Sequence, residues 1–159
     1  MNAALSTEEV LALIPQQRPF RFVDRLIAID ETHAIGEYRF REDESFYAGH
    51  FPSDPVTPGV ILLEAMCQTG LVALGIYLLA LEAPRDEVAK TMTLFTEAQV
   101  EFERVVRPGT LVRIEAERRV WRRRKLKSYV VLSTISNESR AEVVAYGTVA
   151  GLGVTRDRA

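Results

Sequence analysis

A chain of 159 residues, 47% apolar and 26% charged, is long enough for one domain with a sizeable core and too apolar for a disordered segment. Its formal net charge of −2 argues against a general nucleic-acid binder. The single cysteine, Cys67, cannot form an internal disulfide, which fits a reducing cytoplasm. We therefore expect one globular domain over residues 1–159, located in the cytoplasm.

The N-terminal third predicts a helix, two strands and a loop, in the order Thr7–Leu13, Phe20–Ile29, Ala34–Arg41 and Glu42–Thr57. Ser6 and Glu9 have the spacing of a capping box, which indicates where the helix begins. Because the loop contains two prolines, Pro52 and Pro55, we expect it to have a defined shape.

The next segment predicts one long apolar helix. Pro58 suits the first turn, and the pattern continues to about Leu81, a length of roughly 33 Å. Gly70 and Gly75 lower helix propensity, so another element should pack closely against them. The length raises the alternative of a membrane span, but Glu64 inside it would be costly there. We favour the enclosed central helix of a domain, without stable membrane insertion.

The last third alternates apolar and polar residues, as half-buried strands do, over Met92–Phe102, Val112–Val120, Tyr129–Ile135 and Glu142–Ala150. Arg107–Gly109 is a turn, and Asn137–Arg140 joins the last two strands. The simplest packing of these elements is an α+β domain with an antiparallel sheet wrapped around the one long central helix.

Two residues form a candidate acid/base pair. His50 lies in the rigid loop, and Glu64 is the first charged residue of the apolar helix. Desolvation would tune the pKa of each, and the surroundings would suit an apolar substrate. Taken alone, His50 could instead be structural or exposed, and Glu64 could simply pair with an arginine. Cys67 is interpreted as a small core residue.

Three motifs resemble the β-hydroxyacyl-acyl carrier protein dehydratases of the hot-dog fold. Gly49-His50-Phe51-Pro52 matches that family's Gly-His-Phe-Pro, and Pro55–Val60 resembles its Pro-Val-Met-Pro-Gly-Val. Glu64–Gln68 is similar to its Glu-Ala-Met-Ala-Gln, and Ile14–Arg25 to its opening segment. This chain departs from the pattern at a few positions, namely Gln16, Ser53, Thr57, Cys67 and Thr110.

The resemblance implies dehydration of 3-hydroxyacyl-carrier-protein thioesters to trans-2-enoyl thioesters, in fatty-acid or related lipid or polyketide synthesis. It also implies that His50 faces Glu64 of a second subunit, in a homodimer or a trimer of dimers. Glutamate at position 64 resembles the family members that only dehydrate, since the isomerising type carries aspartate there.

The chemistry explains these residue types. Neutral imidazole can take the C2 proton, and a protonated carboxyl can donate to the departing C3 hydroxyl. Backbone N–H groups near Gly59 and Val60 could stabilise charge on the thioester oxygen. Gln68 lies one turn after Glu64, where its side chain could support that carboxyl by a hydrogen bond or satisfy backbone groups. Candidate walls of the acyl tunnel are Val60, Leu63 and Leu71.

The basic run Arg122, Arg123, Arg124 and Lys125 has two interpretations of equal standing. It is either a solvated hairpin end or a docking patch for the acidic carrier protein, whose phosphopantetheine arm delivers the acyl chain. We expect no metal and no further cofactor. Two rival functions stay open: a hot-dog acyl thioesterase, and a catalytically silent acyl-binding or assembly subunit.

Overall fold

The computed structural model describes residues 3–136 and 140–156. Its helices are α1 (Thr7–Leu13), the 3₁₀ helix η1 (Ser45–Ala48), α2 (Gly59–Cys67), the π-helix η2 (Gln68–Ala73), α3 (Leu74–Glu82) and α4 (Arg85–Lys90). Its strands are β1 (Arg25–Ile29), β2 (His33–Arg39), β3 (Thr91–Phe102), β4 (Leu111–Arg122), β5 (Lys125–Ile135) and β6 (Ala141–Thr155).

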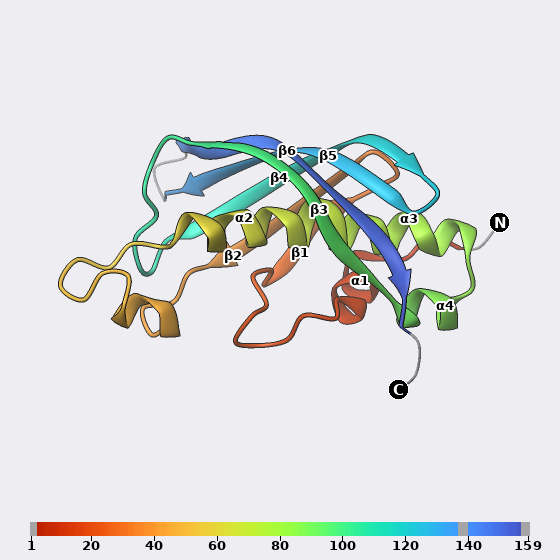
Figure 1. The fold of residues 1–159 in the computed structure, drawn as a ribbon, viewed down its shortest axis with the longest axis horizontal. Helices are drawn as coiled ribbons and strands as arrows, with labels where there is room; N and C mark the ends of the chain where they lie inside the picture. Colours follow the sequence, from red (N-terminus) through yellow and green to blue (C-terminus); the bar gives the residue numbers. More distant parts are fainter. Residues whose placement is uncertain (1–2, 137–139, 157–159) are drawn as a thin grey trace.

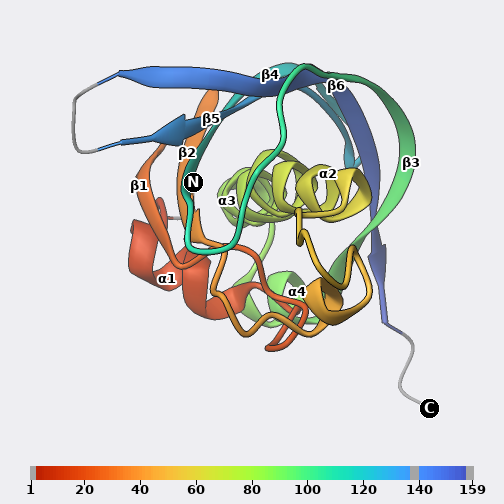
Figure 2. The ribbon, with the colours of Figure 1, turned by 90° about the vertical axis from the view of Figure 1, so that its left-hand side faces the viewer.

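Within the described residues the strands form one antiparallel sheet of six, in the order β1-β2-β4-β5-β6-β3. The sheet curves around α2, η2 and α3, which run end to end through its concave side (Figures 1 and 2). The predicted architecture, an α+β domain with the sheet wrapped around one central helix, is therefore confirmed. The sheet has two edges, and β3 forms one of them.

The central helix extends from Gly59 to Glu82 and is long and apolar enough to cross a membrane. Of its most apolar stretch, however, 67% is buried inside the domain. Its side chains pack against the inner face of the sheet, where Leu62, Met66, Leu74, Ile114 and Leu132 are almost completely buried. It is the core helix of this domain, because the sheet supplies the apolar surroundings that it needs.

Gly70 explains how closely the helix and sheet approach. A Cβ atom at this position would lie 2.7 Å from Cγ2 of Val130 on β5 and 3.3 Å from the Cβ of Ala116 on β4. The Gly70 carbonyl oxygen accepts a hydrogen bond of 2.7 Å from the buried Ser128 hydroxyl. The close packing predicted at Gly70 is confirmed, whereas Gly75 has only ordinary contacts, the nearest being 3.6 Å away.

The predicted strand over Phe20–Ile29 is wrong in its first half, because β1 begins only at Arg25. The backbone N–H of Phe22 donates to the side chain of Gln68 instead of to another strand. β6 extends beyond the predicted end at Ala150, since Thr155 pairs with Thr91 of β3. The predicted connection over Asn137–Arg140 lies outside the described residues, except for Arg140.

Candidate active site

His50 lies in the loop between η1 and α2, and the backbone of that loop holds it at several points. Its N–H donates to the Phe46 carbonyl (3.0 Å), and its carbonyl accepts from Val56 N–H (3.0 Å). The ring stacks on Phe51, with centroids 4.3 Å apart. The loop therefore has the defined shape that its prolines predicted.

The imidazole of His50 is also oriented by a hydrogen bond. Nδ1 lies 2.9 Å from the Val56 carbonyl oxygen. A carbonyl oxygen can only accept, so Nδ1 carries the proton in this bond. In the neutral ring Nε2 then has a free lone pair, which is the state that a general base requires.

Glu64 lies half-buried on α2, one turn before Gln68. Gln68 Nε2 donates to Glu64 Oε1 (2.9 Å) and to the Phe20 carbonyl (2.9 Å), while its Oε1 accepts from the Phe22 N–H (2.7 Å). Gln68 is fully buried, and these bonds engage both of its amide hydrogens. It thus fastens one carboxylate oxygen of Glu64 to the loop before β1.

The environment of Glu64 favours its protonated form. Burial raises the pKa of this carboxyl above its ordinary value, and the hydrogen bond from Gln68 opposes that rise only in part. Among the described residues no hydrogen bond reaches Oε2, so this oxygen is available to a substrate. A neutral carboxyl with one free oxygen can act as a proton donor.

The two candidate catalytic groups do not meet within one chain. In the described part of the molecule no hydrogen bond or ion pair joins His50 to Glu64. The pKa of Glu64 is shifted by burial and by the hydrogen bond from Gln68, and His50 does not contribute to the shift. One chain therefore presents two separate halves of the predicted acid/base pair.

The first turn of α2 contains Gly59 and Val60, whose backbone N–H groups were proposed as donors to the substrate. The N–H groups of Ile61 and Leu62 donate to the Pro58 carbonyl at 2.9 and 3.1 Å. For Gly59 and Val60 the described residues provide no such partner, and both are exposed. Helix N-termini with free N–H groups favour negative charge.

The basic run forms the tight turn between β4 and β5, at the α3 end of the central helix and away from the His50 loop (Figure 1). Arg124 forms an ion pair with Glu87, and Lys125 lies 2.9 Å from Glu97. Arg122 and Arg123 are exposed. In the isolated chain two of the four side chains thus have ion-pair partners, and two face solvent.

One contact of the His50 loop was not predicted. The Tyr47 and Thr57 hydroxyls lie 2.6 Å apart, and both residues are buried. Thr57 stands where the family that the motifs resemble has methionine. This change to a polar residue was the signal from which a hydrogen bond of Thr57 could have been predicted. A second missed feature is the loop before β1, whose backbone holds Gln68.

Comparisons with known proteins identify the family of this chain. A model described as the FabA-like domain matches residues 14–145. The 3-hydroxyacyl-[acyl-carrier-protein] dehydratase FabZ of Chloroflexus aggregans is 42% identical over 115 residues, which are 71% of this chain and 74% of that protein. The protein of the same name from Caldicellulosiruptor saccharolyticus is 37% identical over 139 residues, covering 87% of this chain and 91% of the relative.

Solved structures show the fold alone, because their sequences are distant. The dehydratase heterocomplex ApeI:P from Xenorhabdus doucetiae matches with a TM-score of 0.70 at 12% identity, covering 94% of this chain and 91% of that one. A thioesterase from Haemophilus influenzae matches with a TM-score of 0.64 at 12% identity, covering 97% and 94%. Both dehydratases and thioesterases therefore share this architecture.

The fold places this chain in the class of hot-dog domains. The family match and the relatives narrow that class. This chain belongs to the FabA-like family.

Proposed function

We propose that this protein is a 3-hydroxyacyl-carrier-protein dehydratase in which His50 and Glu64 carry out the elimination. His50 Nε2 takes the C2 proton, and the electron pair left behind forms the C2–C3 double bond. Glu64 donates its proton to the C3 hydroxyl, which leaves as water. A proton passed from His50 to Glu64, directly or through solvent, restores both groups. The half-buried Glu64, fastened by Gln68 with one oxygen free, carries the proposal.

The thioester oxygen gains negative charge as C2 loses its proton. We assign its stabilisation to the N–H groups of Gly59 and Val60, which have no backbone acceptor among the described residues. The helix dipole adds to the same effect. The proposed reaction requires only these proton transfers and hydrogen bonds. Glu64 rather than aspartate fits an enzyme that stops at the 2-enoyl product.

The active unit is a homodimer in this proposal, because His50 and Glu64 need partners that the described residues of their own chain do not supply. The edge strand β3 exposes Leu94 (48%), Phe95 (52%) and Phe102 (47%), and Phe51 (55%) and Val60 (73%) are exposed on the two halves of the site. A second copy that paired along this edge would bury these apolar side chains. Three such dimers could form a hexamer.

The substrate arrives on an acyl carrier protein, whose phosphopantetheine arm holds the thioester. Carrier docking on Arg122, Arg123, Arg124 and Lys125 is part of the proposal. The supporting observation is that Arg122 and Arg123 are exposed and carry no ion pair among the described residues.

Product analysis tests the reaction. The protein is incubated with 3-hydroxydecanoyl-carrier protein, and mass spectrometry follows the carrier-bound product. Loss of one water with the thioester intact supports dehydration, whereas release of the free acid would identify a thioesterase. Bound substrate that never reacts would identify a silent binding subunit. His50→Ala and Glu64→Gln should each fold and lose the reaction.

Mixing the two variants tests the shared site. In a heterodimer of His50→Ala and Glu64→Gln chains, one of the two sites keeps both groups if the site spans the interface. Random exchange should then restore about a quarter of the parent activity in a symmetric dimer. A mixture that exchanges subunits and stays inactive would contradict a site built from two chains.

A further inference from the structure

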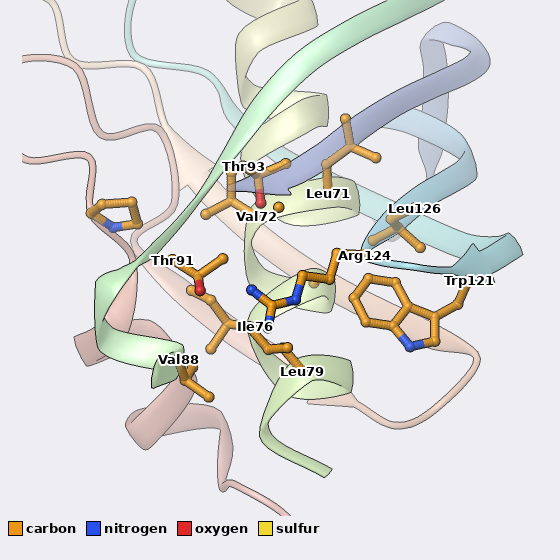
Figure 3. Close-up of a pocket in the computed structure, with 13 residues that line it drawn as sticks. Leu71, Val72, Ile76, Leu79, Val88, Thr91, Thr93, Trp121, Arg124 and Leu126 are labelled. Atoms are coloured by element: carbon orange, nitrogen blue, oxygen red, sulfur yellow. The ribbon is translucent and has the colours of Figure 1, made fainter. Parts of the chain in front are cut away.

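A small cavity of about 20 Å³ lies between the second half of the central helix, β3 and the β4–β5 turn (Figure 3). Leu71, Ile76 and Leu79 from η2 and α3 form one wall, and Val88 of α4 lies at its end. Such a volume holds little more than one water-sized group. Because its walls are mainly apolar, a terminal methyl group fits it better than water does.

The cavity and the candidate active site lie along the same central helix, and one loop contacts both. Leu71 follows Glu64 by seven residues, which is about 10 Å along a helix. Pro15 also lines the cavity, and the loop that follows Pro15 carries Phe20 and Phe22, which hold Gln68. An acyl chain that starts at Glu64 and follows the helix for about 10 Å would therefore end at the level of this cavity.

Arg124 covers the outer end of the cavity, with its side chain extended across it (Figure 3). Its guanidinium forms an ion pair with Glu87 and donates to the Thr155 hydroxyl at 3.3 Å. Beside it, the Trp121 indole donates to Glu82 at 2.7 Å. Charged and polar groups therefore close the end of an apolar cavity.

The turn that carries Arg124 is unusual. Arg123 and Arg124 have φ values of 49° and 62°, in a two-residue connection between Arg122 and Lys125. Such turns normally use Asn-Gly, because side chains other than glycine are strained there. Strained backbone conformations are often found at functional sites. The side chain of Arg124 lies over a cavity instead of in solvent, which suggests that it has a function there.

We propose that Arg124, held by Glu87, sets the upper limit of acyl-chain length in this enzyme, which selects short- and medium-chain 3-hydroxyacyl thioesters. A longer chain would have to push its methyl end against the guanidinium or break the ion pair, and either change removes charged groups from favourable partners. This inference rests on the proposed function, because it takes the ligand to be an acyl thioester bound at Glu64.

The test replaces Arg124 by glycine, which removes the cover and suits the backbone conformation, so the hairpin should still fold. Arg123→Gly is the matched control, since it relieves the same kind of strain in a side chain that does not line the cavity. Substrates are pantetheine thioesters of 3-hydroxybutanoate, 3-hydroxydecanoate and 3-hydroxyhexadecanoate. Without a carrier protein, an effect on docking cannot enter the result.

We expect Arg124→Gly to raise the ratio of kcat/KM for the longest over the middle substrate by about tenfold or more, the scale at which a pocket discriminates alkyl groups. Glu87→Ala should raise it less, because the arginine stem remains. Arg123→Gly should leave the ratio unchanged. An unchanged ratio in Arg124→Gly, or an equal rise in Arg123→Gly, would overturn the proposal.

A binding measurement separates this inference from the proposed function. Trp121 is the only tryptophan of the chain and lines the cavity, so its fluorescence reports occupancy. Saturated acyl-pantetheine thioesters of the same lengths serve as probes. If no substrate is dehydrated, but Arg124→Gly still extends the length that binds, the proposed function fails and the length limit stands. If binding does not depend on length in either form, the limit is wrong.

Discussion

The hydroxyl groups of Tyr47 and Thr57 lie 2.6 Å apart and join the two ends of the loop that carries His50. Tyr47 belongs to η1, and Thr57 directly precedes Pro58 at the start of α2. Thr57 N–H also donates to the Val106 carbonyl at 2.8 Å. Both residues are buried, and the hydrogen bond between their hydroxyls closes the loop at its base.

Thr57→Val should therefore lower kcat more than it changes KM. The variant keeps the shape of the side chain and removes the hydrogen bond, which frees the His50 loop to shift. A shift of about 1 Å in a catalytic group can cost ~10²-fold in rate, so we expect a loss of up to that size. Steady-state kinetics measure it. Tyr47→Phe should give a similar loss, and the double variant should add little. Additive losses would contradict a shared role.

Gln68→Leu should destabilise the protein and alter Glu64. The buried N–H of Phe22 loses its acceptor, which costs about 1–3 kcal/mol in the free energy of unfolding. Because the hydrogen bond from Gln68 lowers the pKa of Glu64, its removal should raise that pKa further. Chemical denaturation and the pH dependence of kcat/KM measure the two effects. A stable variant whose pH profile is unchanged would show that Gln68 does not support Glu64.

The sequence predicted the central helix and the strands well, because their patterns are local. Thr7–Leu13 begins at its capping box as predicted, and the apolar run from Pro58 had no other compact solution than burial under the sheet. The strand predicted over Phe20–Ile29 failed in its first half for a non-local reason. Phe20, Phe22 and Val23 are apolar, but backbone groups of Phe20 and Phe22 bond to Gln68, which lies more than forty positions later in the chain.

Other features depend on geometry that residue patterns do not carry. The central helix changes to π geometry over Gln68–Ala73, which the sequence analysis did not predict. The short helix Arg85–Lys90 follows Pro84 and has acidic residues in its first turn, which was a usable signal. The roles of His50 and Glu64 were identified by motif resemblance, and they stay a prediction until variants are tested.

Gly70→Ala tests the contact between the helix and the sheet. The new Cβ would lie 2.7 Å from Val130 Cγ2, so the core must shift, at a cost of about 1–3 kcal/mol. Thermal or denaturant unfolding measures this loss, which should be smaller when Val130→Ala is added than the separate effects predict. Gly49→Ala is the control, because no atom lies within 4 Å of the new methyl group. Equal stability of Gly70→Ala and the parent would contradict the close packing.

Charge reversal tests the docking patch. Arg122→Glu with Arg123→Glu changes the two exposed side chains of the run and spares the ion pairs of Arg124 and Lys125. We expect a higher KM for carrier-bound substrate, an effect that salt weakens, and little change with a pantetheine thioester. Arg140→Glu, beyond the other end of β5, controls for a charge reversal at a distant place. Equal losses on both substrates would point to a structural role of the turn.

Glu64→Gln should make the protein more stable relative to its parent as the pH rises. Burial raises the folded-state pKa of Glu64 above its unfolded value, so below the unfolded value of about 4.3 both states are protonated. As the pH rises from there, the unfolded chain loses its proton first, and the parent's free energy of unfolding falls until the folded pKa is passed. Glutamine has no proton to lose, so the stability difference should grow through this window and then level off.

Denaturant unfolding of both forms between pH 4 and pH 8, around the ordinary pKa of a glutamate, measures that difference. Exposed Glu142→Gln controls for the removal of one negative charge. In the parent, the same raised pKa should appear as a fall of kcat/KM on the alkaline side, because the donor loses its proton. A stability difference that is independent of pH, together with activity that never falls as Glu64 ionises, would mean that Glu64 is already charged and cannot be the acid.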